Sequence, residues 1–235
     1  ASSYTGATNL NAGTLQAGKP ASLPGYATAG KVAVSSGATL AVNAGGSGEF
    51  AASDITSVLA SGALASGSAI GIDTSNATTP FAYDQVVSGP IGLTKLGGGT
   101  LKLTAANTYT GRTTANGTGS LVLTSLAWTP VLSTGSGAVI NGGKLVFDYT
   151  GTTSPVSTIA SLLKTSHDSS NFRDSAQRLY TTNAADANHS LGYVDNGSTV
   201  IVAYTWNGDS NVDGSITADD YTLIDRGFAK GLTGW

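Results

Sequence analysis

The sequence predicts an all-β fold, a right-handed parallel β-helix, and three observations support this prediction. Short segments alternate between apolar and polar residues, which is typical of half-buried strands. Glycine, asparagine and serine separate these segments, as expected for tight turns. Aromatic residues make up only 7% of the chain, and the segments are shorter than the strands of a β-sandwich. Stacked short coils therefore fit this pattern better than a sandwich does.

The predicted strands follow one another through the first two thirds of the chain. Examples are Lys31–Val34, Ala38–Val42, Thr100–Thr104, Ser120–Leu123, Ala138–Ile140 and Lys144–Phe147. Leucine and valine recur at alternate positions, so we expect them to point inward while threonine and serine point outward. Glycine supplies the positive φ angles that coil corners require. We assign residues 1–156 to this β-helix repeat domain.

The next part of the chain is predicted to close the solenoid, over residues 157–206. A short helix is expected at Ser157–Lys164, like an earlier one at Ser53–Gly62 for which Ser53 is the predicted N-cap. Residues 165–190 are polar and are expected to form an excursion from the solenoid. A β-hairpin follows over Leu191–Tyr204, because Asp195-Asn196-Gly197 is a strong turn signal.

Composition excludes several classes of protein. Charged residues make up 11% of the chain and the net charge is −3, so no basic patch is available for nucleic acid. No apolar run approaches the ~20 residues of a membrane span. The absence of cysteine excludes disulfides and thiolate zinc sites. The first residues lack an export signal, so we expect any such signal to have been removed, and the small uncharged residues favour a secreted bacterial surface protein.

An internal repeat is visible in the sequence. Tyr4-Thr5-Gly6 matches Tyr109-Thr110-Gly111, and similarly spaced glycine and leucine residues follow each copy. A longer lead-in, residues 93–108, precedes the second copy. We therefore expect the chain to begin partway through a repeat of a longer protein.

Residues 93–123 resemble the autotransporter-associated β-strand repeat, also called the passenger-associated transport repeat. The matching residues are Leu96-Gly97, Gly99–Leu103, Asn107–Gly111, Thr113 and Leu121, and residues 3–18 resemble the second half of the same repeat. The resemblance implies β-helical coils of large secreted or surface-displayed bacterial proteins. It implies a role in scaffolding and display and supplies no catalytic residue.

A candidate calcium loop lies near the end of the chain. Calcium takes hard oxygen ligands, and a 12-residue loop presents them at positions 1, 3, 5, 7, 9 and 12 around a glycine at position 6. Those positions are Asp209, Asn211, Asp213, Ser215 (through its carbonyl), Thr217 (through water) and Asp220, with Gly214 at the turn. A strand, Val200–Trp206, precedes the loop in place of an entering helix. The alternative interpretation is a solvated turn that binds no metal.

The same segment resembles half of a type I dockerin, as in planctomycete-like bacterial surface proteins. The resemblance covers Asp209–Asp220 and the helix expected after it, which carries Tyr221, Ile224 and Phe228 along one side. It implies a calcium cofactor and a cohesin-like or other cell-surface partner. A complete dockerin has two such loops, whereas residues 207–235 hold one.

Catalytic signals are weak, and no catalytic residue is assigned. Glu49 is the single glutamate, so a pair of catalytic carboxylates would have to include aspartates. The candidates on the solenoid are Asp54, Asp73, Asp84 and Asp148. His167-Asp168 and His189 are the candidates for a Ser/His/Asp arrangement. A sugar-stacking surface would use Tyr26, Tyr83, Trp128, Tyr149 and Tyr180.

Together these features favour a non-enzymatic extracellular or cell-surface protein that acts as a scaffold, adhesin or assembly module. The expected partners are a second copy stacking through the β-helix ends, a cell-surface protein or a polysaccharide. The alternative is a polysaccharide-active hydrolase or lyase, or a carbohydrate-binding module, built on a β-helix. A role for residues 165–190 is left open.

Overall fold

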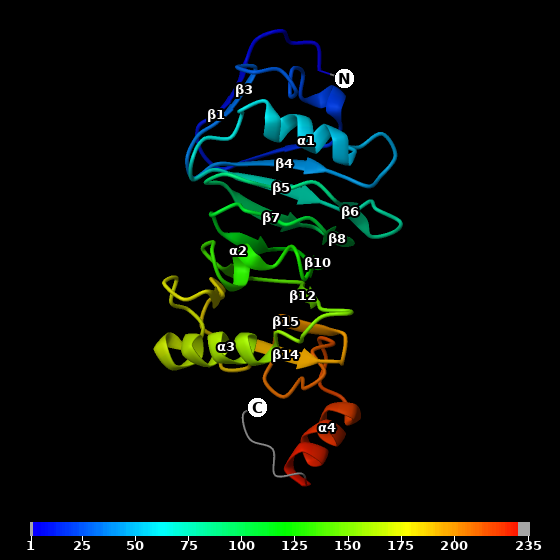
Figure 1. Cartoon of the computed structure of the whole chain (residues 1–235), viewed down its shortest axis with the longest axis vertical. Coiled ribbons are helices and arrows are strands. Elements are labelled where there is room, and N and C mark those ends of the chain that lie inside the picture. Colours follow the sequence, from blue (N-terminus) through cyan, green and yellow to red (C-terminus); the bar gives the residue numbers. More distant parts are fainter. Residues whose placement is uncertain (1, 230–235) are drawn as a thin grey trace.

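The computed structural model describes residues 2–229 and shows a mostly β fold with parallel sheets. The strands are stacked along the long axis of the molecule, with the N-terminal strands at one end and the last helix at the other (Figure 1). The predicted β-rich architecture is therefore confirmed.

Three sheets hold the described strands. A two-stranded sheet pairs β1 (Thr8–Leu10) with β3 (Val32–Val34). The seven-stranded sheet contains, in spatial order, β2 (Thr14–Ala17), β4 (Thr39–Asn43), β5 (Ala69–Asp73), β7 (Gly92–Leu96), β9 (Thr113–Ala115), β11 (Ala138–Ile140) and β13 (Leu179–Tyr180). The six-stranded sheet contains β6 (Phe81–Tyr83), β8 (Thr100–Leu103), β10 (Ser120–Thr124), β12 (Lys144–Asp148), β15 (Thr199–Trp206) and β14 (His189–Asp195).

From β7 to β12 the chain alternates between the two larger sheets, placing one strand in each before returning. Neighbouring strands of these turns are parallel. Among the strands of residues 2–229, the antiparallel pairs are β12–β15 and β15–β14. The six strands predicted from alternation coincide with β3, β4, β8, β10, β11 and β12. Period-2 alternation therefore located these six strands correctly.

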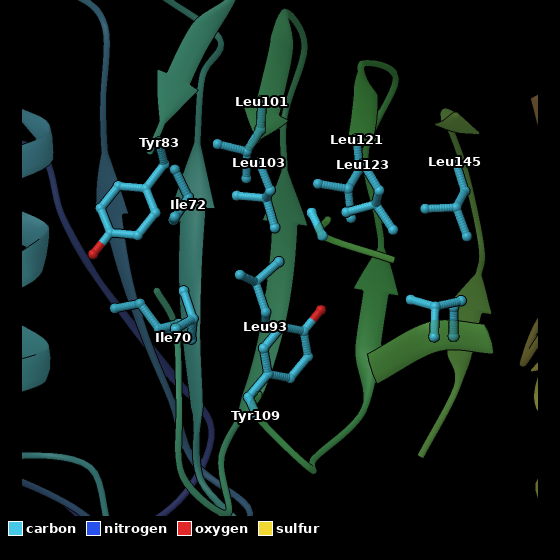
Figure 2. Packing of buried hydrophobic residues seen from close by; sticks show 14 of the residues in the cluster. Ile70, Ile72, Tyr83, Leu93, Leu101, Leu103, Tyr109, Leu121, Leu123 and Leu145 are labelled. Atoms are coloured by element: carbon cyan, nitrogen blue, oxygen red, sulfur yellow. The ribbon is translucent and has the colours of Figure 1, made fainter. Parts of the chain in front are cut away.

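Strand register places like side chains above one another. In the six-stranded sheet, Leu101, Leu121 and Leu145 are aligned partners, and all three are fully buried. In the seven-stranded sheet, Leu40, Ile70 and Leu93 form an equivalent column. Figure 2 shows the leucine and isoleucine side chains of the two sheets lying between them. Each column is shared by successive strands, so every turn of chain buries its apolar face against the next.

Two polar side chains interrupt the inward columns of the seven-stranded sheet. Thr113 lies between Leu93 and Ala138, and its hydroxyl is 2.6 Å from the Tyr109 hydroxyl. Burial raises the pKa of Tyr109 to about 12, so it remains a neutral hydrogen-bonding group.

Lys95 is the second polar side chain in the inward columns of the seven-stranded sheet, and it is fully buried. Its ammonium donates to the carbonyls of Leu96, Gly97 and Gly98 at 2.5, 3.1 and 2.9 Å. Burial lowers the pKa of Lys95 to about 8, and the neighbouring Asp73 carboxylate opposes this shift. The lysine thereby satisfies the carbonyls of the glycine turn that joins β7 to β8.

Glycines at the strand turns let successive coils approach closely. Gly117 has a φ of 117°, and a Cβ at this position would lie 2.5 Å from the Gly97 carbonyl oxygen. A Cβ on Gly119 would clash with the Gly99 carbonyl. The stacking distance at this corner therefore requires glycine.

Both predicted helices exist, with different bounds. The first, α1, covers Ala52–Ala60, and Ala51 rather than Ser53 is its N-cap residue. The prediction that Ser53 caps this helix is wrong because the Asp54 carboxylate accepts the Ala51 N–H at 2.9 Å and starts the helix earlier. The second, α3, covers Val156–Ser170 and is longer than predicted. A four-residue helix, α2 (Thr129–Leu132), and a 3-10 turn, η1 (Pro20–Ser22), complete this part.

The segment 165–190 is more regular than predicted. Helix α3 occupies its first residues, and β13 joins the seven-stranded sheet beside β11. Arg112 links this segment to the sheet, because its guanidinium lies 4.7 Å over the Tyr180 ring and donates to the Ser175 carbonyl at 3.1 Å. The hairpin prediction is confirmed: β14 and β15 pair antiparallel around the turn that contains Gly197.

Shortening one inward side chain in a column of aligned residues should lower the stability of the stacked sheets. We expect Leu121→Ala to cost about 2–5 kcal/mol of unfolding free energy, because it leaves a cavity between Leu101 and Leu145. Val122→Ala, on the other face of the same strand, should cost less than ~1.5 kcal/mol. Urea denaturation followed by circular dichroism measures both, and equal losses would contradict the assignment of inward and outward faces.

Candidate calcium loop and its surroundings

The predicted loop lies between strand β15, which ends at Trp206, and helix α4 (Ala218–Ala229). The expected strand before the loop and helix after it are thus both present. Residues 230–235, the end of the predicted 207–235 module, lie outside the described residues.

Asp209, at position 1, is 5% exposed and holds the first half of the loop. Its carboxylate accepts the backbone N–H groups of Asp213 at 3.0 Å and Gly214 at 2.9 Å. The Thr205 hydroxyl, on β15, also donates to it. The loop is therefore folded around this carboxylate and tied to the sheet through Thr205.

Asp220, at position 12, closes the loop from the first turn of α4. Its carboxylate accepts the N–H groups of Ser210 at 2.8 Å, Asn211 at 3.2 Å and Thr217 at 2.9 Å. These backbone bonds, led by that from Thr217, lower the pKa of the Asp220 carboxyl. Asp220 thus joins the two ends of the loop.

The intermediate positions form a more exposed group. The Asn211 amide donates to Asp213 at 3.0 Å and to Asp219 at 2.8 Å. The Asp213 carboxylate also accepts the Ser215 N–H at 2.9 Å, and the Thr217 hydroxyl donates to Asp219. The structure therefore brings the six predicted residues into one loop and adds Asp219, which the 12-residue spacing does not select.

Val212 of the loop packs against the β14–β15 hairpin. It is 1% exposed and has a φ of 58°, an unfavourable conformation for a β-branched residue. A Cβ on Gly192 of β14 would lie 3.7 Å from a Val212 methyl group. Val212 therefore lies over Gly192, at an ordinary van der Waals distance from the Cβ position.

The donor set of the loop suits a hard cation, because its side chains offer carboxylate, amide and hydroxyl oxygens. The salt bridges found within residues 2–229 include none to the loop aspartates. In the same part of the chain, no three His, Cys, Asp or Glu side chains converge as a metal site. A calcium ion would therefore need the Asn211 side chain and the Ser215 carbonyl in addition to carboxylates.

The predicted apolar side of α4 is largely exposed to solvent. Tyr221 is 62% and Phe228 is 85% exposed, while Ile224 is partly buried. The helix is thus fixed at its N-terminal end by Asp220 and presents exposed aromatic side chains further along.

The acidic residues of the stacked sheets have separate structural partners. Asp54 accepts the Tyr26 hydroxyl at 2.6 Å, Asp73 accepts Ser75 N–H at 2.9 Å, and Asp148 pairs with Lys102 at 3.0 Å. Glu49 accepts the Asn76 amide at 2.6 Å, and Asp84 accepts the Gln85 amide at 3.0 Å. Each of them has a local role in a turn, a helix start or an ion pair.

The five aromatic residues that a sugar-stacking surface would use do not form an exposed surface. Tyr83, Tyr149 and Tyr180 are buried, and Tyr26 and Trp128 are partly buried against Phe50 and Phe147. These aromatic residues fill the space between strands and helices. Packing between strands and helices therefore accounts for their positions.

The two histidines lie in different surroundings. His167, on α3, is exposed and its Nδ1 is 3.4 Å from Asp168. His189, at the start of β14, is 2.6 Å from Asp186 through Nδ1 and lies against Trp206. The sequence pattern did not predict that His189, Asp186 and Trp206 lie together. The signal that could have found the His189–Trp206 pair is the predicted hairpin, whose strand ends lie opposite each other.

Both copies of the internal repeat carry the same local contact. The hydroxyls of Tyr4 and Thr8 are 2.6 Å apart, as are those of Tyr109 and Thr113. The copies occupy different sheets, since Thr8 lies in β1 of the two-stranded sheet and Thr113 in β9 of the seven-stranded sheet. Tyr109 is buried, whereas Tyr4 is 42% exposed at the end of the stack.

Comparison with known families agrees with this repeat. The passenger-associated-transport-repeat family matches residues 1–17 and 93–117, the segments that contain the two Tyr–Thr pairs. No curated protein and no solved structure gave a significant match. None of the helices described in residues 2–229 has the length and apolar character needed to cross a membrane.

Asp220 should titrate below its usual value of 3.8. Because its pKa is lower in the folded chain, its ionised form stabilises the loop above pH ~4, and this contribution is lost as the pH falls through the folded pKa. Carboxyl carbon NMR measures the titration. In hydrogen exchange, Asp220→Asn should expose the amides of Ser210 and Thr217, whereas Asp219→Asn should not; equal effects would contradict the closing role of Asp220.

Proposed function

We propose that this chain is part of a secreted or cell-surface bacterial repeat protein, in which a right-handed parallel β-helix acts as a rigid non-enzymatic scaffold. The main support is the in-register stacking of parallel strands through segments that match a passenger-associated transport repeat. Such repeats imply display outside the cell.

The right-handed sense follows from a general rule. Each return to the seven-stranded sheet, from β7 to β9 and from β9 to β11, passes through one strand of the other sheet. Connections of this kind between parallel strands are right-handed in about 98% of cases. This is the basis for assigning a right-handed β-helix.

A scaffold role fits the chemistry of the stack. The inward columns are largely aliphatic, and the acidic side chains along the sheets have structural partners. Shared columns couple each turn of chain to the next, which favours stiffness over local opening. These features support a spacer or adhesive surface and give no group a catalytic task.

The Asp209–Asp220 loop adds a proposed calcium-dependent function. In this proposal, Asp209, Asn211, Asp213, Ser215, Thr217 and Asp220 supply oxygens to one calcium ion, and the loop–helix is a dockerin-like half-module. The exposed Tyr221 and Phe228 of α4 would then face a cohesin-like or other cell-surface protein. Calcium would neutralise the acidic side chains and fix the start of α4.

Self-association through the N-terminal end of the stack also belongs to this proposal. Within residues 2–229, strands β1 and β2 each pair with another strand on one side only. Backbone groups along their outer edges are therefore open to another strand. A hollow lined by Tyr4, Leu15 and Leu23 lies beside them. A second copy is the expected occupant.

Surface display can be tested on the bacterium that produces the protein. We expect protease added to intact cells, or analysis of the culture medium, to reveal the chain without lysis. A fluorescently tagged cytoplasmic protein in the same cells is the control, because its release or digestion would reveal lysis. Recovery of the chain exclusively after cell disruption would contradict the proposed location.

Calcium binding should be saturable, with about one ion per chain. Isothermal titration with calcium measures it, and Asp209→Ala with Asp213→Ala should abolish the binding heat. Asp168→Ala, on exposed helix α3, is the matched control and should bind as the wild type does. Wild-type protein that gives no heat at millimolar calcium would reduce the loop to a solvated turn.

A further inference from the structure

A cluster of ring side chains lies at the open end of the β14–β15 hairpin, outside the proposed calcium loop. His189 and Trp206 are directly opposed in the strand register, and their ring centroids are 3.9 Å apart. The Tyr204 ring stacks on His189 at 5.6 Å, with an interplanar angle of 19°. Trp206 is nevertheless 43% exposed. A large exposed aromatic ring with a fixed neighbour is a common element of binding surfaces.

A carboxylate fixes the orientation of the imidazole. His189 Nδ1 is 2.6 Å from Asp186 Oδ2, and Asp186 Oδ1 accepts the Asn188 N–H at 2.8 Å. The backbone bond from Asn188, followed by the His189 contact, lowers the pKa of the Asp186 carboxyl. Asp186 thus remains ionised, and Nε2 is the ring nitrogen left for another partner.

The backbone around these rings is tied together by a short network. Asn207 donates from its N–H to the Asn188 carbonyl at 2.7 Å and from its side chain to the Ala187 carbonyl at 2.9 Å. The Ser190 hydroxyl donates to the Asn207 side chain at 2.6 Å. The rings and the carboxylate are therefore held in place before any ligand arrives, which lowers the entropy cost of binding.

We propose that Trp206, His189 and Asp186 form a binding site for a neutral pyranose unit of a polysaccharide. The apolar C–H face of a sugar ring can pack on the exposed indole, while the carboxylate and imidazole accept or donate hydrogen bonds to ring hydroxyls.

Charge selects neutral sugars over acidic ones. The charge within the site is the Asp186 carboxylate, whose pKa is also lowered by the nearby Arg173, and the chain carries a net charge of −3. A phosphate, sulfate or uronate group would be repelled here. This site is independent of the scaffold and calcium proposals, because none of its three residues is an expected calcium ligand or a member of the stacked columns.

The test is a titration of the full chain with neutral hexasaccharides (β-glucan, xylan and mannan fragments) by calorimetry and tryptophan fluorescence. We expect at least one to bind, with Trp206→Ala weakening binding by about tenfold or more and Trp206→Phe retaining most of it. His189→Gln should weaken binding less. Leu126→Ala, which removes an exposed apolar side chain between β10 and α2, is the control and should have no effect.

Three outcomes would overturn the proposal. The first is that no neutral hexasaccharide binds at about 10 mM. The second is unchanged affinity in Trp206→Ala, with folding of that variant verified by circular dichroism. The third is binding of an oligogalacturonate in place of every neutral sugar. Repeating the titration with excess chelator separates this site from the calcium loop, because sugar binding should persist without calcium.

Discussion

Register between parallel strands is the constraint on which this structure depends. An inward leucine or isoleucine is buried because the next strand places a similar side chain above it, as Leu101, Leu121 and Leu145 do. A shift of one residue would turn each apolar face toward solvent. The glycine corners belong to the same constraint, since side chains at Gly117 or Gly119 would separate the coils. The buried Lys95 ammonium is compatible with this packing because three backbone carbonyls accept its hydrogen bonds.

The end of the stack positions the surfaces with proposed ligands. Strand β15 pairs antiparallel with both β12 and β14. At its end, Thr205 donates a hydrogen bond to Asp209, and the Trp206 ring contacts His189. The two proposed sites therefore lie on consecutive residues of one strand whose side chains point to opposite faces. A rigid sheet beneath them holds their geometry, whereas the exposed part of α4 is free for a protein partner.

Alternation and turn residues were enough to predict six of the stacked strands, the hairpin and the loop–helix, but not β1, β2, β5, β6, β7 and β9. The longer α3 and the short β13 were missed because their polar residues obscure the periodicity, and packing against the sheets decides their structure. Ser53 was a plausible cap, but the Asp54 carboxylate reaches the Ala51 N–H. Burial of Tyr83 and Tyr149 depends on contacts between distant coils. The His189–Trp206 pair could have been found by extending the predicted hairpin register to its open end.

The most direct test measures distances along one column of the six-stranded sheet. The outward residues Ala82, Lys102, Val122, Val146, Ile201 and Val194 are aligned in successive strands, and the chain has no cysteine to interfere with labelling. Nitroxide pairs at Ala82/Ile201 and Ala82/Val194 span four and five strand spacings. Pulsed electron–electron double resonance should give narrow distance distributions near about 19 and 24 Å, which differ by one strand spacing. Broad distributions, or two means that do not differ by about one spacing, would contradict the stacked register.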